Sequence, residues 1–265
     1  MEKPMLEIKD LRVLFPVHKK WLPAVDGVSL SIHPGEITGV VGESGSGKSV
    51  MSQSILRLRD HDTAVHYEGE ILFEDENILD KPLDAMREIR GNSISIIFQD
   101  PLNSLSPVHT VGKQLSETLI LHKKMTKLEA KARAIEMLKL TGIPNPENCM
   151  KKYPFELSGG MQQRVMIAMA LSCEPKLLIA DEPTTALDVT IQEQILHLIR
   201  ELNEKLGMSV LFITHDMGAV SQLCHSCGRC LNRRIVCKTA SSIYGRTSCL
   251  HSASWRRTRK RTSND

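Results

Sequence analysis

The sequence predicts an α/β fold with a mainly parallel sheet flanked by helices, an N-terminal antiparallel β subdomain and an inserted α-helical lobe. Three observations support this prediction. From residue 36 onward, short apolar runs alternate with amphipathic helical patterns, which is typical of parallel strands joined by helices. Before them lie two short stretches in which apolar and polar residues alternate. A long stretch at about 101–171 contains helical patterns only, and is expected to form a separate lobe.

The elements follow in chain order. Leu6–Leu14 and Ser29–Ile32 are the predicted antiparallel strands, and the turn Pro34-Gly35 precedes a buried strand rich in β-branched residues at Glu36–Gly42. The later predicted strands are Ser93–Asp100, Lys176–Pro183 and Met208–Asp216, and the predicted helices are Lys48–Arg59, Thr126–Gly142, Ser158–Leu171, Ile191–Gly207 and Asp216–Cys224.

The helix that starts at Thr126 has the clearest signals. Glu129 stands three residues later, as in a capping box, and Gly142 is a plausible C-terminal stop. The predicted buried face, by helical spacing, consists of Leu128, Ala132, Ile135 and Leu138.

The overall composition is that of an ordinary globular domain. The chain has 265 residues, of which 41% are hydrophobic and 25% charged. It has no run of the roughly 18 apolar residues that a membrane span needs. The N-terminal residues include early acids and no apolar run, so a secretory signal is not expected.

The stretch GESGSGKS fits the phosphate-binding pattern G-x-x-x-x-G-K-[ST], with a predicted strand before it and a helix after it. Its glycines allow backbone N–H groups to turn toward phosphate oxygens at a helix N-terminus. Lys48 would reach the β- and γ-phosphates, and the Ser49 hydroxyl would coordinate Mg²⁺. The pattern therefore predicts a P-loop NTPase core that binds ATP. The expected nucleotide-binding residues here are Gly42, Glu43, Ser44, Gly45, Ser46, Gly47, Lys48, Ser49 and Val50.

The stretch LLIADEP supplies two carboxylates at the end of a buried strand. Ligands bind at the carboxyl ends of strands in α/β sheets, so Asp181 is expected to hold Mg²⁺. Glu182 is then the natural base for the attacking water.

A second helix start of the anion-binding kind occurs in LSGGMQQR. Ser158 is a favourable N-cap, and Gly159 and Gly160 leave the first N–H groups uncovered. One nucleotide does not need two such sites on one subunit. Two subunits packed head to tail would use both.

Five motifs in order resemble those of the ATP-binding cassette (ABC) family, specifically its transporter ATPases. They are GESGSGKS, Gln99 in IIFQDP, LSGGMQQR, LLIADEP with Ala186–Asp188 after it, and His215 in FITHD. The resemblance covers about Met5 to Leu223. The stretch FQDPLNSLSPVHTVG further resembles the subfamily that imports dipeptides, oligopeptides and nickel into bacteria.

The resemblance implies a role for each matched residue. Gln99 would contact Mg²⁺ or the attacking water and sense the membrane subunits. His215 would contact the γ-phosphate and hold the geometry around Glu182. An N-terminal aromatic would stack on adenine; Phe15 is slightly favoured over Trp21. The residues implied to meet the partner's nucleotide or the dimer seam are Ser158, Gly159, Gly160, Gln162 and Asp188.

The implied partners are a second ABC ATPase subunit, identical or similar, and integral membrane permease subunits. An external substrate-binding protein would act indirectly, and no nucleic acid is expected. The subunit would sit peripherally on the cytoplasmic face of the bacterial inner membrane. Two alternatives are a soluble ATPase of the same family in repair or translation, and an inactive truncated remnant.

The C-terminal segment 224–265 differs from the residues before it. It holds ten of the 34 Lys/Arg, one of the 31 Asp/Glu and five of the seven cysteines. Three interpretations compete: a thiolate metal site that begins at CHSCGRC, a basic arm for lipid or nucleic acid, and a disordered, out-of-frame or truncated end. We favour the last, because acids, apolar periodicity and family motifs are lost together. Residues 1–223 are then the ATPase domain, with Arg233–Val236 loosely resembling its closing strand.

Overall fold

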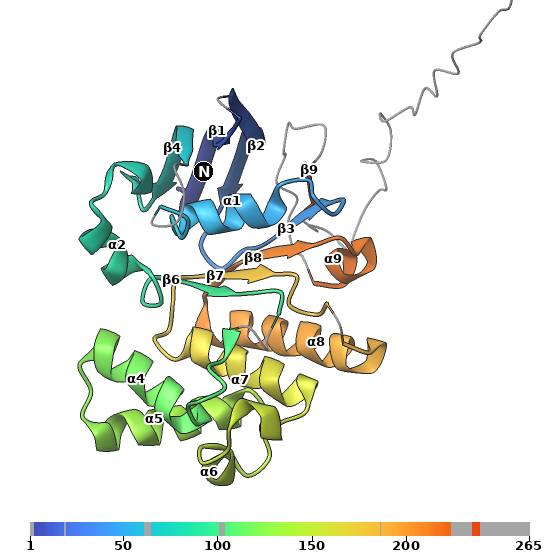
Figure 1. Ribbon diagram of the computed structural model, residues 1–265. Helices are drawn as coiled ribbons and strands as arrows, with labels where there is room; N and C mark the ends of the chain where they lie inside the picture. Colours follow the sequence, from blue (N-terminus) through green and yellow to red (C-terminus); the bar gives the residue numbers. More distant parts are fainter. Residues whose placement is uncertain are drawn as a thin grey trace, which may run out of the picture.

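The computed structural model describes residues 3–18, 20–60, 65–100, 104–185 and 187–223, together with the backbone of 235–238 (Figure 1). The strands are β1 (Leu6–Val17), β2 (Lys20–Ile32), β3 (Ile37–Gly42), β4 (His66–Phe73), β5 (Glu76–Asn77), β6 (Ile94–Ile97), β7 (Leu177–Asp181), β8 (Ser209–Thr214) and β9 (Ile235–Lys238). The helices are α1 (Lys48–Ile55), α2 (Leu83–Ile89), α4 (Val111–Lys123), α5 (Lys127–Leu140), α6 (Pro146–Cys149), α7 (Gly159–Leu171), α8 (Val189–Leu206) and α9 (Met217–Leu223), with 3₁₀ turns η1 (Ile78–Asp80) and η2 (Pro154–Glu156).

The central sheet has the strand order β6-β7-β8-β3-β9. The first four strands are parallel, and β9 pairs antiparallel with β3 at the edge. The backbone of β9 overlaps the closing strand expected at Arg233–Val236; the rest of segment 224–265, with its cysteine cluster, lies outside the described residues. The predicted α/β fold with a P-loop NTPase core is confirmed.

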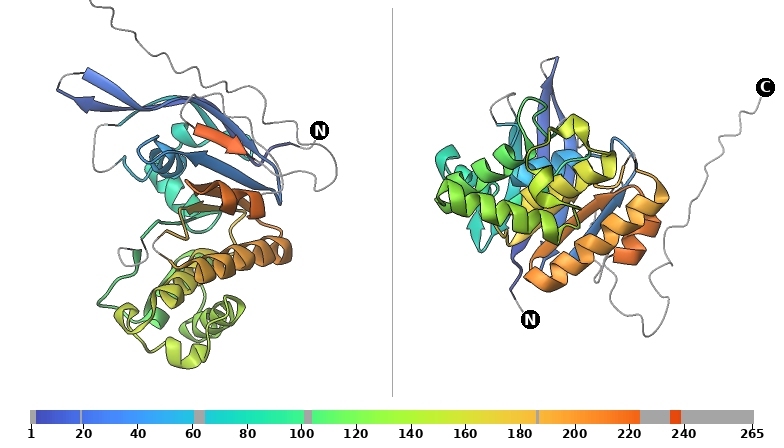
Figure 2. Two further views of the ribbon diagram at one scale, coloured as in Figure 1. Left: turned by 90° about the vertical axis from the view of Figure 1, so that its right-hand side faces the viewer. Right: turned by 90° about the horizontal axis from the view of Figure 1, so that it is seen from below.

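The second sheet, β2-β1-β4-β5, is antiparallel. Figure 2 shows β1 and β2 as a long hairpin that reaches away from the rest of the molecule. β2 begins at Lys20, nine residues before the predicted strand start at Ser29. The sequence did not indicate this extension because it contains Pro23 and Gly27, residue types that are unfavourable within strands. Pairing with β1 nonetheless continues to Val17 opposite Lys20, through several register shifts.

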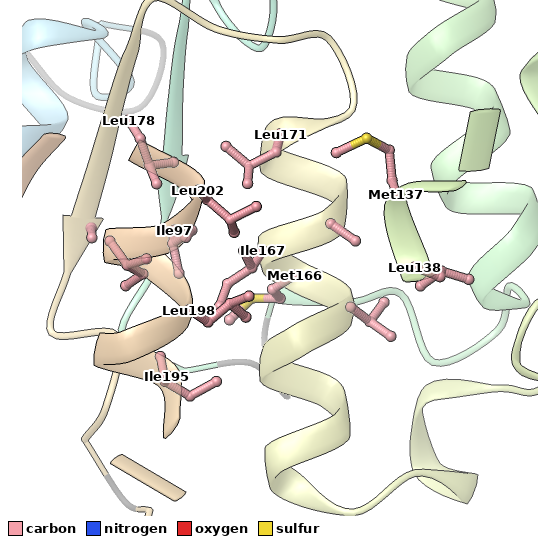
Figure 3. Close-up of a cluster of buried hydrophobic side chains, with 14 of the residues drawn as sticks. Ile97, Met137, Leu138, Met166, Ile167, Leu171, Leu178, Ile195, Leu198 and Leu202 are labelled. Atoms are coloured by element: carbon pink, nitrogen blue, oxygen red, sulfur yellow. The ribbon is translucent and has the colours of Figure 1, made fainter. Parts of the chain in front are cut away.

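Side chains on the two faces of the central sheet enter two separate cores. In β8, Leu211 and Ile213 pack with α1 and the antiparallel sheet, whereas Val210 and Phe212 pack with the helices on the other side. Figure 3 shows the second of these cores, in which α7 lies between α8 and α5. Burial on both faces explains why these strands appear in the sequence as continuous apolar runs.

The helical lobe is formed by α4, α5 and α6, and α7 joins it to the sheet (Figure 1). The predicted capping box is confirmed, because the Thr126 hydroxyl accepts from the Glu129 N–H and the Glu129 carboxylate accepts from the Thr126 N–H. The predicted buried face was correct at Leu138 but wrong at Leu128 and Ala132, which are exposed. Leu128 is 80% exposed, whereas the buried face consists of Ala130, Ala134, Met137 and Leu138. Small alanines allow α5 to lie close to α4 and α7. Within the described ranges, no helix has the length and apolar character needed to cross a bilayer.

Candidate active site

The carboxyl ends of four parallel strands meet at one edge of the central sheet. β3 runs into the predicted phosphate loop (residues 43–47), Gln99 follows β6, Glu182 follows β7 and His215 follows β8. These segments enclose a pocket of about 490 Å³. Its lining residues are Pro23, Ala24, Ser44, Gly45, Ser46, Gly47, Lys48, Ser49, Val50, Gln99, Glu182, Thr185 and His215. Sequence positions as far apart as 44 and 215 therefore come together, as strand ends do in α/β folds.

The phosphate loop depends on a glycine at position 47. Gly47 has φ +94°, which L side chains rarely adopt, and an added Cβ would lie 2.3 Å from the Ala24 carbonyl oxygen. Gly45 also has a positive φ, of +77°, but an added Cβ there would meet nothing within 4 Å. The backbone can thus wrap closely around the pocket, and α1 begins at its floor with its N–H groups directed inward.

Lys48 is 4% exposed and extends back along the loop. Its Nζ donates to the carbonyl oxygens of Gly42 and Glu43, at 2.7 and 2.9 Å, and lies 3.8 Å from Glu182 Oε1. Gly42 and Glu43 thus hold this lysine and do not line the pocket itself. The ammonium group is buried beside the space where a phosphate would need a counter-charge.

Ser46 gives an independent indication of an oxyanion ligand. Its Oγ is buried and has no hydrogen-bond partner among the described residues. An unpaired buried hydroxyl costs free energy unless a partner occupies the site. A phosphate oxygen in the loop would satisfy this hydroxyl, so the residues present fit a nucleotide phosphate.

Asp181 lies behind the pocket and is 2% exposed. Its Oδ1 accepts from Ser49 Oγ at 3.1 Å, and its Oδ2 accepts from Ser52 Oγ at 2.9 Å. Desolvation by burial raises the pKa of Asp181, and the two hydroxyl hydrogen bonds act in the opposite direction. A hydroxyl and a carboxylate are the hard oxygen donors that Mg²⁺ prefers, so the predicted metal residues Ser49 and Asp181 fit that ion. The side-chain amide of Gln99, the third predicted ligand, donates a hydrogen bond to Glu182 Oε2 at 3.2 Å.

The Glu182 carboxylate is held by three donors on one oxygen. Oε2 lies 3.2 Å from Gln99 Nε2, 3.0 Å from Thr185 Oγ1 and 3.2 Å from His215 Nδ1. Glu182 is 9% exposed and has φ +49°, an unfavourable conformation for a residue with a side chain. Such strain of about 1–3 kcal/mol is typical of functional positions. Sequence reasoning missed Thr185, although its place three residues after Glu182 was a usable signal.

The glycines of the second motif lie in a different pocket, of about 430 Å³. Ser158, Gly159 and Gly160 line it together with Asp188, whose side chain caps α8. Ser158 is the N-cap residue of α7, as predicted, but its side chain makes no capping bond. The first N–H groups of α7 are therefore open to this pocket.

Gln162 does not lie where the sequence placed it, and the two aromatics considered for the adenine contact, which stays a prediction, lie outside the phosphate pocket. Gln162 is 5% exposed and lines neither pocket; its amide donates to the carbonyls of Pro154 and Leu157, so that it holds the preceding turn and not a ligand. Phe15 does not line the phosphate pocket, because it packs against the core with the Arg59 guanidinium 5.9 Å from its ring centroid. Trp21 also lies outside that pocket. Trp21 is 50% exposed and contacts the His66 ring.

Known proteins are similar to this chain in sequence and in fold. The ABC transporter family model matches residues 25–185, and an AAA domain model matches residues 153–221. The oligopeptide transport ATP-binding protein AppD of Bacillus subtilis is 52% identical over 218 residues, which are 82% of this chain and 66% of that protein. The dipeptide transport ATP-binding protein DppD of the same species is 51% identical over 223 residues, 84% of this chain and 66% of that protein. The chain thus spans just under two thirds of the length of these relatives.

A similar solved structure is a dimeric ATP-binding cassette in a post-hydrolysis state, bound to ADP and Pi. It is 33% identical, with a TM-score of 0.71, over 81% of this chain and 90% of that one. The family model covers more than half of the present chain, and it includes the phosphate loop, the α7 motif and both carboxylates. This chain belongs to the ABC transporter family of nucleotide-binding ATPase cassettes.

Proposed function

We propose that this chain is the ATP-hydrolysing subunit that energises a bacterial ABC importer for dipeptides, oligopeptides or nickel. The observation that carries the proposal is the arrangement of Glu182, fixed by three donors at the mouth of the phosphate pocket and close to Lys48. The relatives described above are oligopeptide and dipeptide transport ATP-binding proteins, which supports the peptide class. Nickel rests on the sequence resemblance alone.

In this proposal, the phosphate loop binds the triphosphate of ATP. Backbone N–H groups of the loop and the first turn of α1 would bond phosphate oxygens, with the Ser46 hydroxyl among them. Lys48 would turn from the Gly42 and Glu43 carbonyls toward the β- and γ-phosphates. The buried position of the lysine strengthens its attraction for phosphate, because little water screens it.

Ser49 and Asp181 would hold Mg²⁺, and Gln99 would complete this side of the site. The bound ion would neutralise charge on the β- and γ-phosphate oxygens. Ser49 can serve the ion and Asp181 together, because its hydroxyl proton is donated to Oδ1 while a lone pair of Oγ remains available.

Glu182 would act as the base in hydrolysis. A water oxygen forms a bond to the γ-phosphorus, the bond between that phosphorus and the bridging oxygen of ADP breaks, and the water proton passes to Glu182. The three donors already occupy Oε2, so Oε1, which faces Lys48, is the oxygen that accepts this proton. His215, with its side chain 59% exposed, would contact the γ-phosphate while its ring keeps Glu182 in place.

The second pocket supports a head-to-tail pair of subunits. Ser158, Gly159 and Gly160 lie in a pocket separate from the phosphate loop of the same chain, with the uncapped α7 N-terminus at hand. A second subunit would bring its own bound γ-phosphate to this N-terminus. Asp188 would then lie at the seam. The dimeric state of the solved relative is in keeping with this arrangement.

A groove on the helical lobe supports docking of a permease segment. It has a volume of about 1100 Å³ and lies between α4, α5 and α6. Ile120, Leu121 and Ile135 provide apolar surface, and lysines such as Lys127 and Lys131 are among its charged residues. An amphipathic, partly acidic segment would fit. Such docking would keep this subunit at the cytoplasmic face of the inner membrane, and the external binding protein would contact only the permease.

The test is reconstitution of the full chain with its permease in lipid vesicles. We expect ATP hydrolysis by the complex, stimulated by the external binding protein loaded with a dipeptide, an oligopeptide or Ni²⁺, one of which is taken up. Hydrolysis with no cargo-dependent stimulation would argue for the soluble class of ABC ATPases. A chain that neither binds nor hydrolyses ATP would contradict the proposal altogether.

A further inference from the structure

Ser52 is a buried hydroxyl that the mechanism above does not use. It lies in α1, three residues after Ser49, so that both side chains project from the same face of the helix. Ser49 lines the phosphate pocket, whereas Ser52 is 0% exposed and does not. A nucleotide in the pocket therefore cannot touch the Ser52 hydroxyl, and any effect on the site must pass through a neighbouring residue.

That neighbour is Asp181, at the end of β7 and 129 positions away in sequence. Ser52 Oγ lies 2.9 Å from Oδ2, while Ser49 Oγ lies 3.1 Å from Oδ1. Each oxygen of the carboxylate is thus held by one hydroxyl of α1. A carboxylate with a single donor can still turn about its Cβ–Cγ bond, but donors on both oxygens oppose that rotation.

Ser52 Oγ also lies 3.0 Å from the Ser49 carbonyl oxygen, the local contact that serines commonly make within helices. A hydroxyl has one hydrogen and cannot donate fully to both acceptors. The carboxylate is the stronger acceptor, because hydrogen bonds to charged groups are about twice as strong as neutral ones. The proton of Ser52 is therefore directed mainly to Asp181.

We propose that Ser52 is a positioning residue for the divalent metal: it fixes the Asp181 carboxylate in the orientation in which that carboxylate and Ser49 hold the ion. This inference rests on the proposed function, which assigns Ser49 and Asp181 to Mg²⁺. Residues that orient metal ligands typically change metal affinity by about 10- to 100-fold when they are removed. Ser52 should accordingly influence the metal and leave metal-free nucleotide binding untouched.

The same helix supplies a matched control. Ser54 is 2% exposed, and its Oγ donates to the Val50 carbonyl at 2.7 Å. Ser54→Ala removes a buried hydroxyl and a helix-internal contact, as Ser52→Ala does, but leaves Asp181 alone. Ser52→Cys is a second variant, which keeps a side chain of similar shape with a much weaker donor. It separates loss of the hydrogen bond from loss of packing.

The experiment is a titration of Mn²⁺, which shares the oxygen-ligand preference of Mg²⁺, into the full chain with bound ADP. Protein-bound Mn²⁺ is followed by electron paramagnetic resonance, and binding of fluorescent ADP in EDTA is measured separately. We expect Ser52→Ala to raise the half-saturating Mn²⁺ concentration about 10- to 100-fold. Ser52→Cys should shift in the same direction, Ser54→Ala should match wild type, and ADP binding in EDTA should be equal in all four proteins.

Three outcomes would overturn this inference but leave the proposed function standing. They are wild-type Mn²⁺ affinity in Ser52→Ala, a loss of Mn²⁺ affinity in Ser54→Ala as large as that in Ser52→Ala, and wild-type Mn²⁺ affinity in Ser52→Cys. A wild-type chain that binds no Mn²⁺ with ADP would instead overturn the proposed function, and the inference with it. Thermal melting of each variant shows whether it is folded. If Ser52→Ala melts far below Ser54→Ala, Ser52→Cys becomes the deciding comparison.

Discussion

Thr185 Oγ1 donates to Glu182 Oε2 at 3.0 Å, from the turn that directly follows β7. The two residues are three positions apart, and this hydrogen bond closes the turn onto the side chain of the proposed base. Gln99 and His215 reach the same oxygen from other strand ends. Three donors therefore orient the Glu182 carboxylate and with it Oε1, and Thr185 is the one nearest to Glu182 in sequence.

Removal of the Thr185 hydroxyl should slow hydrolysis with little effect on nucleotide affinity. Thr185→Val keeps the shape of the side chain but not the donor. A hydrogen bond to a charged group contributes about 1.5–3 kcal/mol, so we expect kcat to fall by about 10- to 100-fold. The dissociation constant for ATP should stay near that of wild type. Thr185→Ser retains the donor and should largely restore kcat, and equal losses in both variants would contradict a role through this bond.

Glu182→Gln should abolish most of the hydrolysis while ATP binding persists. The amide keeps the volume of the side chain but cannot take a proton from water, and general base catalysis typically contributes about 10²- to 10⁴-fold. Steady-state turnover and a fluorescent-ATP titration measure the two effects separately. Unchanged turnover would rule out Glu182 as the base. Loss of ATP binding would show that Glu182 mainly supports the pocket.

Local signals in the sequence predicted part of this fold well. The motif positions, the parallel strands and the capping box at Thr126 all depend on residues a few places apart, and the structure agrees with them. Leu128 was misjudged because helical spacing defines a face but not its phase. The phase is set by the approach of α4 and α7, which favours the small Ala130 and Ala134.

The sequence was least informative about contacts between distant segments. The Ser52 hydrogen bond to Asp181 joins residues 129 positions apart, and no local pattern indicates it. The burial of Gln162 depends in the same way on the carbonyls of the preceding turn. The residues proposed to bind phosphate follow from a local motif in the sequence, whereas the residues that orient the carboxylates required the structure.

Gly47 should tolerate no side chain. Gly47→Ala combines an unfavourable φ of +94° with a Cβ 2.3 Å from the Ala24 carbonyl, so the loop must move and nucleotide affinity should fall sharply. Gly45→Ala is the matched control, with φ +77° and no atom within 4 Å of its Cβ. It should lose much less affinity in the same fluorescent-nucleotide titration. Equal losses would show that backbone conformation, not the close approach to Ala24, decides the requirement.

The head-to-tail arrangement predicts that two inactive variants restore each other. Lys48→Ala removes the lysine proposed to bind the β- and γ-phosphates. Gly159→Asp puts a negative charge where the partner's phosphate would lie, and should not disturb folding. Its Cβ would have only an ordinary 3.8 Å contact with Leu187, and an acid suits the first turn of a helix. Each composite site consists of the phosphate loop of one subunit and the α7 N-terminus of the other. In a dimer of either variant alone, both composite sites carry the substitution.

In a mixed dimer, both substitutions fall in one composite site and the other site is intact. An equal mixture of the two variants should therefore recover about a quarter of wild-type turnover, because half of the dimers are mixed and each has one intact site. Turnover is measured after the purified variants have been allowed to exchange subunits with ATP. A mixture no more active than its components would mean that two copies of this chain do not share their sites. The second subunit would then have to be a different chain.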